Sequence, residues 1–298
     1  MFKDKVKGWL RELKVTFKIL RRNRAAFVGL IIFIGFLFMA YVGPYIRPYN
    51  EIYYNFEERF VLPSLEHPLG TDYRGRDTLA QMIDGSTNII TVALLTGLFS
   101  TFLSFSIGMV SGYLGGKVDR ALMFLADVFL VIPSFPLLLL IAAVVGRTLS
   151  PLEIAGLISI VGWAGLARAV RSQVLSIKSS DFIEAARCLG LSTSHIVFRE
   201  ILSNLTPYLF MSMITSMVGA IYSQTGLAYL GLLPLETTNW GFVINTAMYT
   251  YQAFFSQNLG VLLYFFVPVS LIVLLQSSLV MLLSGLEEVF NPRLRTEA

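Results

Sequence analysis

The residues best suited to chemistry lie in two polar stretches of an otherwise apolar chain. In the first stretch, Asp72, Arg74, Arg76 and Asp77 stand within six positions of one another. Acids grouped with bases in this way can build a catalytic or a metal-binding cluster. Short Asp side chains beside glycines also form Asx turns, and neighbouring acids and bases form ion pairs. We interpret this stretch as such a self-satisfied network, with no catalytic and no metal-binding residue.

The second polar stretch, residues 181–207, has the pattern of a short helix, a turn and a second helix. Glu184, Ala185 and Ala186 lie in a run of helix-forming residues, and Gly190 follows as the residue that tolerates a positive φ. The cap of the second helix comes from one of three hydroxyl residues, Ser192, Thr193 or Ser194. The sequence therefore predicts a helix–turn–helix between two apolar segments.

The order Glu-Ala-Ala, three residues, Gly and, about nine residues on, Ile-Leu resembles the cytoplasmic EAA loop of permease subunits of ATP-binding-cassette (ABC) importers. The family usually has Pro after Ile-Leu, whereas this chain has Ser203 there and Pro207 four residues later. We therefore expect the second helix to run further before it breaks.

This resemblance implies that the loop over 178–204 holds a coupling helix, which docks in a groove on a separate ATPase subunit. The residues that match the motif are Asp181, Glu184, Ala185, Ala186 and Gly190. The side chains fit that role, because small alanines let another surface approach closely and the glutamate can meet a basic partner. A plain helical hairpin between two membrane spans is the alternative interpretation.

Three other stretches are similar to the importer subfamily for dipeptides, oligopeptides and nickel. They are HPLGTDYRGRD at 67–77, LAYLGL at 227–232 with Asn-Trp-Gly at 239–241, and GLEEVFNPRLR at 285–295. With the loop, these matches are spread over about residues 27–295. The resemblance thus covers nearly the whole chain and implies a C-type permease subunit with the type I importer fold.

Composition independently indicates a membrane protein. Of 298 residues, 55% are hydrophobic and 14% charged, and the mean hydropathy is +0.68. The net charge of +4 is spread over loops, as membrane topology demands, so no nucleic-acid partner is predicted. The single cysteine, Cys188, permits no disulfide within the chain and indicates no metal site.

The predicted architecture is all-α with six transmembrane helices and an N-terminal amphipathic helix at the membrane surface. The apolar segments lie at 25–45, 88–114, 118–145, 152–170, 205–232 and 259–283. The domains are a cytoplasmic amphipathic helix over 1–24, a first transmembrane helix over 25–45, an extracytoplasmic loop over 46–86, a five-helix core over 87–285 and a cytoplasmic tail over 286–298. Basic loops alternate with acidic ones, which predicts a multi-pass plasma-membrane protein with both termini in the cytoplasm.

Few polar residues lie within the predicted spans. Asp127 is the one ionisable candidate, interpreted as a helix-packing or snorkelling acid, with a role in transport as the alternative. On the fifth span, small and polar residues can pack helices or line a passage, and four are predicted to border the translocation path: Ser216, Gly219, Ser223 and Gln224. As we align the chain, many family members have Glu where Gln224 stands, which favours a neutral solute such as an oligosaccharide over a basic peptide.

These features predict a permease subunit that forms half of a pathway for peptides or a similar small solute. The resemblance implies four kinds of partner: a homologous second permease subunit, two ATPase subunits that bind ATP and Mg, an extracytoplasmic solute-binding protein, and the lipid bilayer. The chain has no phosphate-binding Gly-x-x-x-x-Gly-Lys-Ser/Thr loop, so we expect it to bind no cofactor and to be no enzyme. The alternatives are an ion-coupled secondary transporter, which would need a pattern of charges in the membrane, and an intramembrane enzyme, although His67 and His195 both lie in polar loops.

Overall fold

The computed structural model describes residues 22–145, 149–232 and 238–290. The predicted amphipathic helix over 1–24 lies almost entirely outside the described residues, as does most of the predicted tail over 286–298. The described part is helical throughout, apart from loops and one isolated β-bridge.

Five described helices are long and apolar enough to cross a membrane. They are α2 (Arg24–Tyr41), α4 (Thr78–Leu114), α7 (Pro151–Lys178), α10 (Leu202–Tyr229) and α12 (Leu259–Phe290). The pair α5 (Gly116–Val131) and α6 (Ser134–Val145) passes the same test only when its two helices are taken together, and their axes differ by 81°. The predicted all-α architecture is confirmed, with five or six candidate membrane spans.

The break between α5 and α6 has a local cause. Ile132 is extended, with φ −84° and ψ 122°, because the ring of Pro133 disfavours the helical conformation in the residue before it. The next helix starts at once, with the amide of Leu137 donating to the carbonyl of Pro133. Residues 118–145, predicted as one span, therefore form two helices with different directions.

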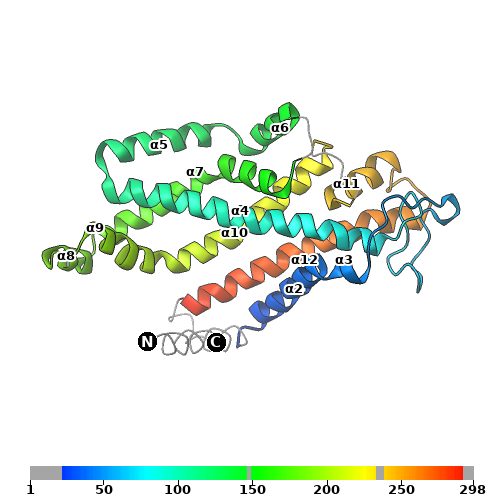
Figure 1. Cartoon of the computed structure of the whole chain (residues 1–298), viewed down its shortest axis with the longest axis horizontal. Coiled ribbons are helices and arrows are strands. Elements are labelled where there is room, and N and C mark those ends of the chain that lie inside the picture. Colours follow the sequence, from blue (N-terminus) through cyan, green and yellow to red (C-terminus); the bar gives the residue numbers. More distant parts are fainter. Residues whose placement is uncertain (1–21, 146–148, 233–237, 291–298) are drawn as a thin grey trace.

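Helix α4 is the central element of the bundle and lies alongside α7 and α10 (Figure 1). Glycines on α4 make this close packing possible, because a Cβ at Gly108 would lie 2.6 Å from the carbonyl oxygen of Ala167 on α7. A Cβ at Gly97 would lie 2.6 Å from the Met217 side chain on α10. The small residues of α4 thus set the distances between three of the membrane helices.

Helix α4 begins ten residues before the predicted span. Asp77 is its N-cap, and its carboxylate accepts a hydrogen bond from the amide of Ala80 at 2.9 Å. The helix therefore occupies the last part of the segment predicted as an extracytoplasmic loop over 46–86. At 1.5 Å per residue, these ten residues add roughly 15 Å of helix to the apolar span.

The remaining elements lie at the two ends of the bundle. They are α3 (Gly43–Ile46), the 3₁₀ turn η1 (Phe56–Glu58), α8 (Asp181–Cys188), α9 (Thr193–His195), the π-helical turns η2 (Ile196–Ile201) and η3 (Thr246–Thr250), and α11 (Trp240–Asn245). Figure 1 shows α8 and α9 at one end, and α11 with the loop before α4 at the other. The two polar stretches of the sequence thus lie at opposite ends of the molecule.

Candidate functional site

Helix α8 is attached to the bundle by its inner face. Ile183 is fully buried and Ala186 is 6% exposed. Both belong to an apolar cluster with Val174 of α7, and with Ile196 and Ile201 of η2. This packing fixes the position of α8 relative to two membrane helices.

The outer face of α8 is uncovered. Asp181, Glu184 and Ala185 are exposed, as are two large apolar side chains, Phe182 at 45% and Leu189 at 79%. Of the two alanines, Ala186 packs inward against α7 and η2, and Ala185 is exposed. The outer face combines two acids with exposed apolar surface.

Gly190 ends α8 in the conformation that the sequence predicts. Its φ is +72°, and the chain makes the two hydrogen bonds of a Schellman motif. The amide of Leu191 donates to the carbonyl of Ala186 at 3.1 Å, and the amide of Gly190 donates to the carbonyl of Arg187 at 2.9 Å. Of the three candidate caps, Ser192 performs the role, because its hydroxyl accepts from the amide of His195 at 3.3 Å.

The second helix of the loop runs on without a break. Residues 193–229 form one continuous helical segment through α9, η2 and α10, and Pro207 lies inside it. The expected extension beyond the usual proline position is confirmed.

The four predicted path residues on α10 do not share one environment. Gly219 is exposed, Ser216 and Ser223 are half-buried, and Gln224 is 1% exposed. The Gln224 amide nitrogen donates to the carbonyl of Ile89 on α4 at 2.8 Å. The structure thus places Gln224 in a contact between two helices, away from the exposed face on which Gly219 lies.

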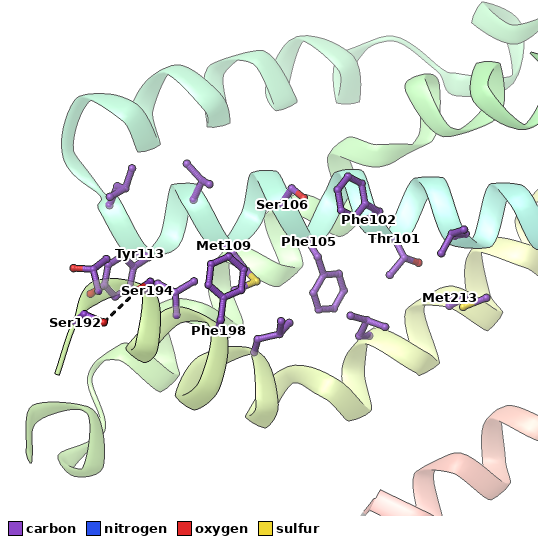
Figure 2. A pocket seen from close by; sticks show the side chains of 17 residues that line it. Thr101, Phe102, Phe105, Ser106, Met109, Tyr113, Ser192, Ser194, Phe198 and Met213 are labelled. Carbon is purple, nitrogen blue, oxygen red and sulfur yellow. Dashed lines mark hydrogen bonds between the residues drawn. The ribbon is translucent and has the colours of Figure 1, made fainter. Parts of the chain in front are cut away.

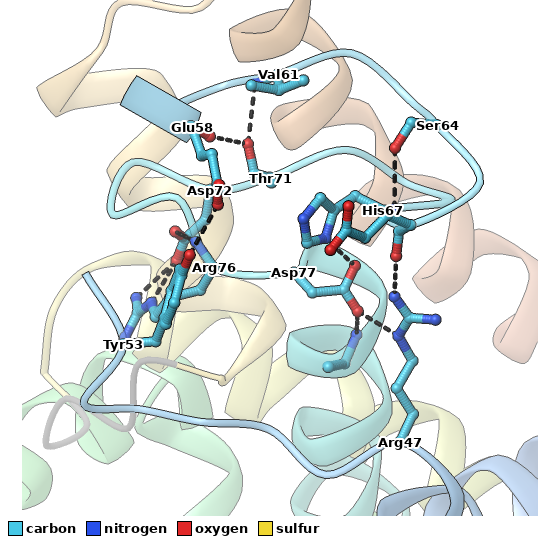
Figure 3. Close-up of polar contacts among 12 residues, drawn as sticks. Arg47, Tyr53, Glu58, Val61, Ser64, His67, Thr71, Asp72, Arg76 and Asp77 are labelled. Carbon is cyan, nitrogen blue, oxygen red and sulfur yellow. Dashed lines mark hydrogen bonds and ion pairs between the residues drawn. The ribbon is translucent and has the colours of Figure 1, made fainter. Parts of the chain in front are cut away.

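At the other end of the molecule, the first polar stretch forms a closed network (Figure 3). Asp72 accepts from the amides of Arg74 and Arg76 at 2.8 and 2.9 Å and from the Arg76 Nε at 2.7 Å. Burial would lower the pKa of Arg76, but its hydrogen bond and ion pair with Asp72 outweigh burial and raise that pKa above its ordinary value. Asp77 caps α4 and also pairs with Arg47 and, at 3.4 Å, with His67. The interpretation as a structural network is confirmed.

An apolar groove of about 890 Å³ runs between α4 and the α9–η2–α10 segment (Figure 2). Its larger lining side chains are Phe102, Phe105, Met109, Phe198 and Met213. None of its lining residues is charged. Because a charged or zwitterionic solute needs polar partners, we do not place the solute pathway in this groove.

A model of the family described as "Binding-protein-dependent transport system inner membrane component" matches residues 104–296, which is more than half of the chain. The chain belongs to this family. A second model, described as "N-terminal TM domain of oligopeptide transport permease C", matches residues 13–65.

Known relatives of this inner membrane component are permease proteins. It is 28% identical over 277 residues to the "Dipeptide transport system permease protein DppC" of Bacillus subtilis, covering 93% of this chain and 84% of the relative. It is 34% identical over 213 residues to the "Oligopeptide transport system permease protein OppC" of Mycobacterium tuberculosis, covering 70% and 72%. Among solved structures, an inward-facing form of the MetNI methionine ABC transporter matches with a TM-score of 0.50 and 19% identity over 69% of this chain and 96% of that one, which is a likeness of fold.

Two polar contacts of this inner membrane component were not predicted from its sequence. Asp119, at the start of α5, accepts hydrogen bonds from both Nε and Nη2 of Arg171 on α7. Asp127, further along α5, pairs with Arg168 on α7. Both arginines lie in a stretch rich in basic residues, a pattern that predicts an orientation in the membrane but no pairing partner. An acid and a base far apart in sequence give no local signal of pairing.

Metal-ligating side chains do not cluster in the part of this membrane component that the structure describes. Residues 22–145, 149–232 and 238–290 contain no group of three His, Cys, Asp or Glu side chains that could hold an ion. The features left for function are the outer face of α8 and the exposed faces of the membrane helices.

Proposed function

We propose that this chain is one of two homologous permease subunits of an ATP-driven importer of peptides, and that it encloses half of the translocation pathway. The second permease subunit supplies the other half. Two separate ATPase subunits bind ATP and Mg, and a solute-binding protein delivers the peptide at the extracytoplasmic side. This chain carries no cofactor of its own.

The observation that carries the proposal is the construction of α8. Its inner face is held by Ile183 and Ala186, and its outer face presents Phe182 and Leu189 among acids. Large apolar side chains left uncovered beside charges are typical of a protein–protein contact. The outer face of α8 therefore fits a docking surface for an ATPase subunit.

The path from this surface into the membrane supports coupling. Residues 193–229 continue directly from the turn at Gly190, so a tilt of α8 moves α10 as a rigid body. On α10 we assign Ser216, Gly219 and Ser223 to the wall of the passage. Gln224 does not join them, since its amide is bonded to Ile89.

The solute proposed is a peptide. Two relatives that cover most of this chain are named as dipeptide and oligopeptide permeases. The case for an oligosaccharide was based on Gln224 at the mouth of the pathway, and that side chain is buried between α10 and α4. A peptide therefore agrees better with the names of the relatives than an oligosaccharide does.

The proposed orientation places both termini and α8 in the cytoplasm. The start of α5 and the segment around α8 carry the basic residues Lys117, Lys178, Arg187 and Arg199, whereas the loop before α4 is rich in acids. Basic loops stay on the cytoplasmic side. The surface of α8 then lies on the side where ATP is available.

The test uses the complex reconstituted in vesicles with the second permease subunit, the ATPases and the binding protein. Glu184→Lys reverses a charge on the outer face of α8, and Glu57→Lys makes the same change on an exposed residue at the opposite end. We expect Glu184→Lys to lower ATPase co-purification and ATP-dependent peptide uptake at least about tenfold, because like charges facing each other at a protein interface disfavour association. Glu57→Lys should leave ATPase binding unchanged. Unchanged ATPase binding in Glu184→Lys, or uptake driven by an ion gradient without ATP, would refute the proposal.

A further inference from the structure

An exposed ion pair joins α5 and α7 within the membrane-spanning part of the molecule. The carboxylate of Asp127 contacts the guanidinium of Arg168. The Asp127 side chain is 54% exposed and that of Arg168 is 51% exposed. Each charge therefore has its partner on one side and an open face on the other.

The position of Asp127 along α5 puts it about three turns beyond the start of that helix, where we place the membrane surface. It follows Gly116, the first residue of α5, by eleven positions, which is about 16 Å of helix. Half of a hydrocarbon core is about 15 Å. An aspartate side chain is too short to reach the interface from such a depth, whereas an arginine can snorkel.

A half-exposed carboxylate at this depth does not face lipid. Charged groups within membrane helices face the bundle interior or a water-filled cavity, since hydrocarbon offers no partner for the open side. Helix α5 is open on most of its surface, since Ala126 is its only buried residue.

We propose that the Asp127–Arg168 pair lies on the water-filled wall of the solute pathway, where the carboxylate and the guanidinium contact the charged groups of a passing peptide. The proposal is based on the function proposed above. It adds a polar contact site on the α5–α7 face to the serines of α10. A peptide carries an ammonium and a carboxylate at its ends, and the pair offers one partner of each sign.

The same exposure would arise if a helix of the second permease subunit covered the pair. The two arrangements differ in access to water. In the passage, a thiol at position 127 ionises and reacts with a charged reagent, whereas a thiol buried under a helix or in lipid stays inert. This difference tests the location without depending on transport.

The first experiment labels single-cysteine variants of the assembled complex with methanethiosulfonate ethylsulfonate, an anionic reagent that does not cross membranes. Asp127→Cys is compared with Ile34→Cys, which is 54% exposed on α2, both with Cys188→Ser. We expect labelling at 127 to be at least about tenfold faster, since only a thiolate in water reacts readily. Equal rates at the two positions would overturn the proposal.

The second experiment measures uptake of trilysine and triglutamate in the reconstituted complex. Asp127→Asn leaves Arg168 unopposed and should lower the ratio of trilysine to triglutamate uptake about two- to fifteenfold, as expected for unit charges about 10 Å apart. Arg168→Gln should raise the same ratio. A structural role alone would reduce the uptake of both peptides equally in both variants, and that result would refute the contact with solute.

Loss of all peptide uptake in the wild type, with position 127 still reactive, would count against the proposed function and leave the water-facing location supported.

Discussion

Arg171 on α7 donates two hydrogen bonds to Asp119 on α5, with its Nε 2.5 Å from Oδ1 and its Nη2 2.6 Å from Oδ2. The Ser111 hydroxyl of α4 donates to the same carboxylate at 2.5 Å. Three helices are therefore joined at one acid, close to the start of α8. Because the guanidinium matches both carboxylate oxygens, this contact fixes the orientation of α5 as well as its distance from α7.

Replacing Arg171 should loosen that end of the bundle. Arg171→Ala leaves the partly buried Asp119 with only the Ser111 hydroxyl, and we expect a loss of about 1–3 kcal/mol in the free energy of unfolding. Thermal unfolding of the purified chain in detergent measures the change. Arg199→Ala, at an exposed arginine of η2, is the control and should have little effect. An Arg171→Ala variant as stable as the control would show that this contact contributes nothing.

The buried pair of the network before α4 should be more sensitive. Asp72 is fully buried and Arg76 is 2% exposed, so Asp72→Asn leaves a buried guanidinium without its counter-charge. We expect a destabilisation of about 3–5 kcal/mol, the usual cost of breaking a buried ion pair from one side. Limited proteolysis of the loop before α4 reports this change directly, with Glu57→Gln at an exposed position as the control. If the loop resists protease equally in both variants, the pair does not hold it.

Close packing along α4 gives a prediction with a matched pair of glycines. A Cβ at Gly108 would lie 2.6 Å from the Ala167 oxygen and 2.7 Å from the Val170 Cβ, so Gly108→Ala must push α7 away. Overpacking of this kind costs about 1–3 kcal/mol. Gly35→Ala on α2 has nothing within 4 Å and should be tolerated. We expect the melting temperature of Gly108→Ala to be lower than that of Gly35→Ala. Equal melting temperatures would contradict the packing described for α4 and α7.

The turn, the helix cap and the loop network could be predicted from sequence because each depends on local chemistry. Gly190 adopts a positive φ, and Ser192 caps the helix that follows it. The Asp72 carboxylate accepts a hydrogen bond from the amide of Arg76, four residues later. Each of these features is decided within a few residues. The positions of the long apolar helices followed from local composition for the same reason.

The bend and the helix rotations could not be predicted, since they depend on contacts distant in sequence. Pro133 marks a sharp break in its predicted span, whereas Pro207 and Pro268 lie inside α10 and α12. Neighbouring membrane helices decide whether a proline is accommodated. Gln224 illustrates the second difficulty, because α10 has small polar and apolar residues on all sides, and no pattern shows that residue 224 faces α4 while residue 219 is exposed.

A substitution at Gly190 tests the coupling of α8 to α10 separately from the folding of the chain. Proline at this position cannot adopt φ +72°, and it removes the amide that donates to Arg187. Because α8 is still held to the bundle by Ile183, we expect Gly190→Pro to assemble with the second permease subunit while α8 is displaced from the start of α9. ATP-dependent uptake in reconstituted vesicles should then fall at least about tenfold, since a displacement of one ångström in a positioned group can cost about a hundredfold in rate. Gly190→Ala is the matched control: its Cβ meets nothing within 4 Å, so only backbone strain of about 1–2 kcal/mol is added. Uptake by Gly190→Pro at the level of Gly190→Ala would show that the geometry of this turn does not carry the motion of α8 to α10.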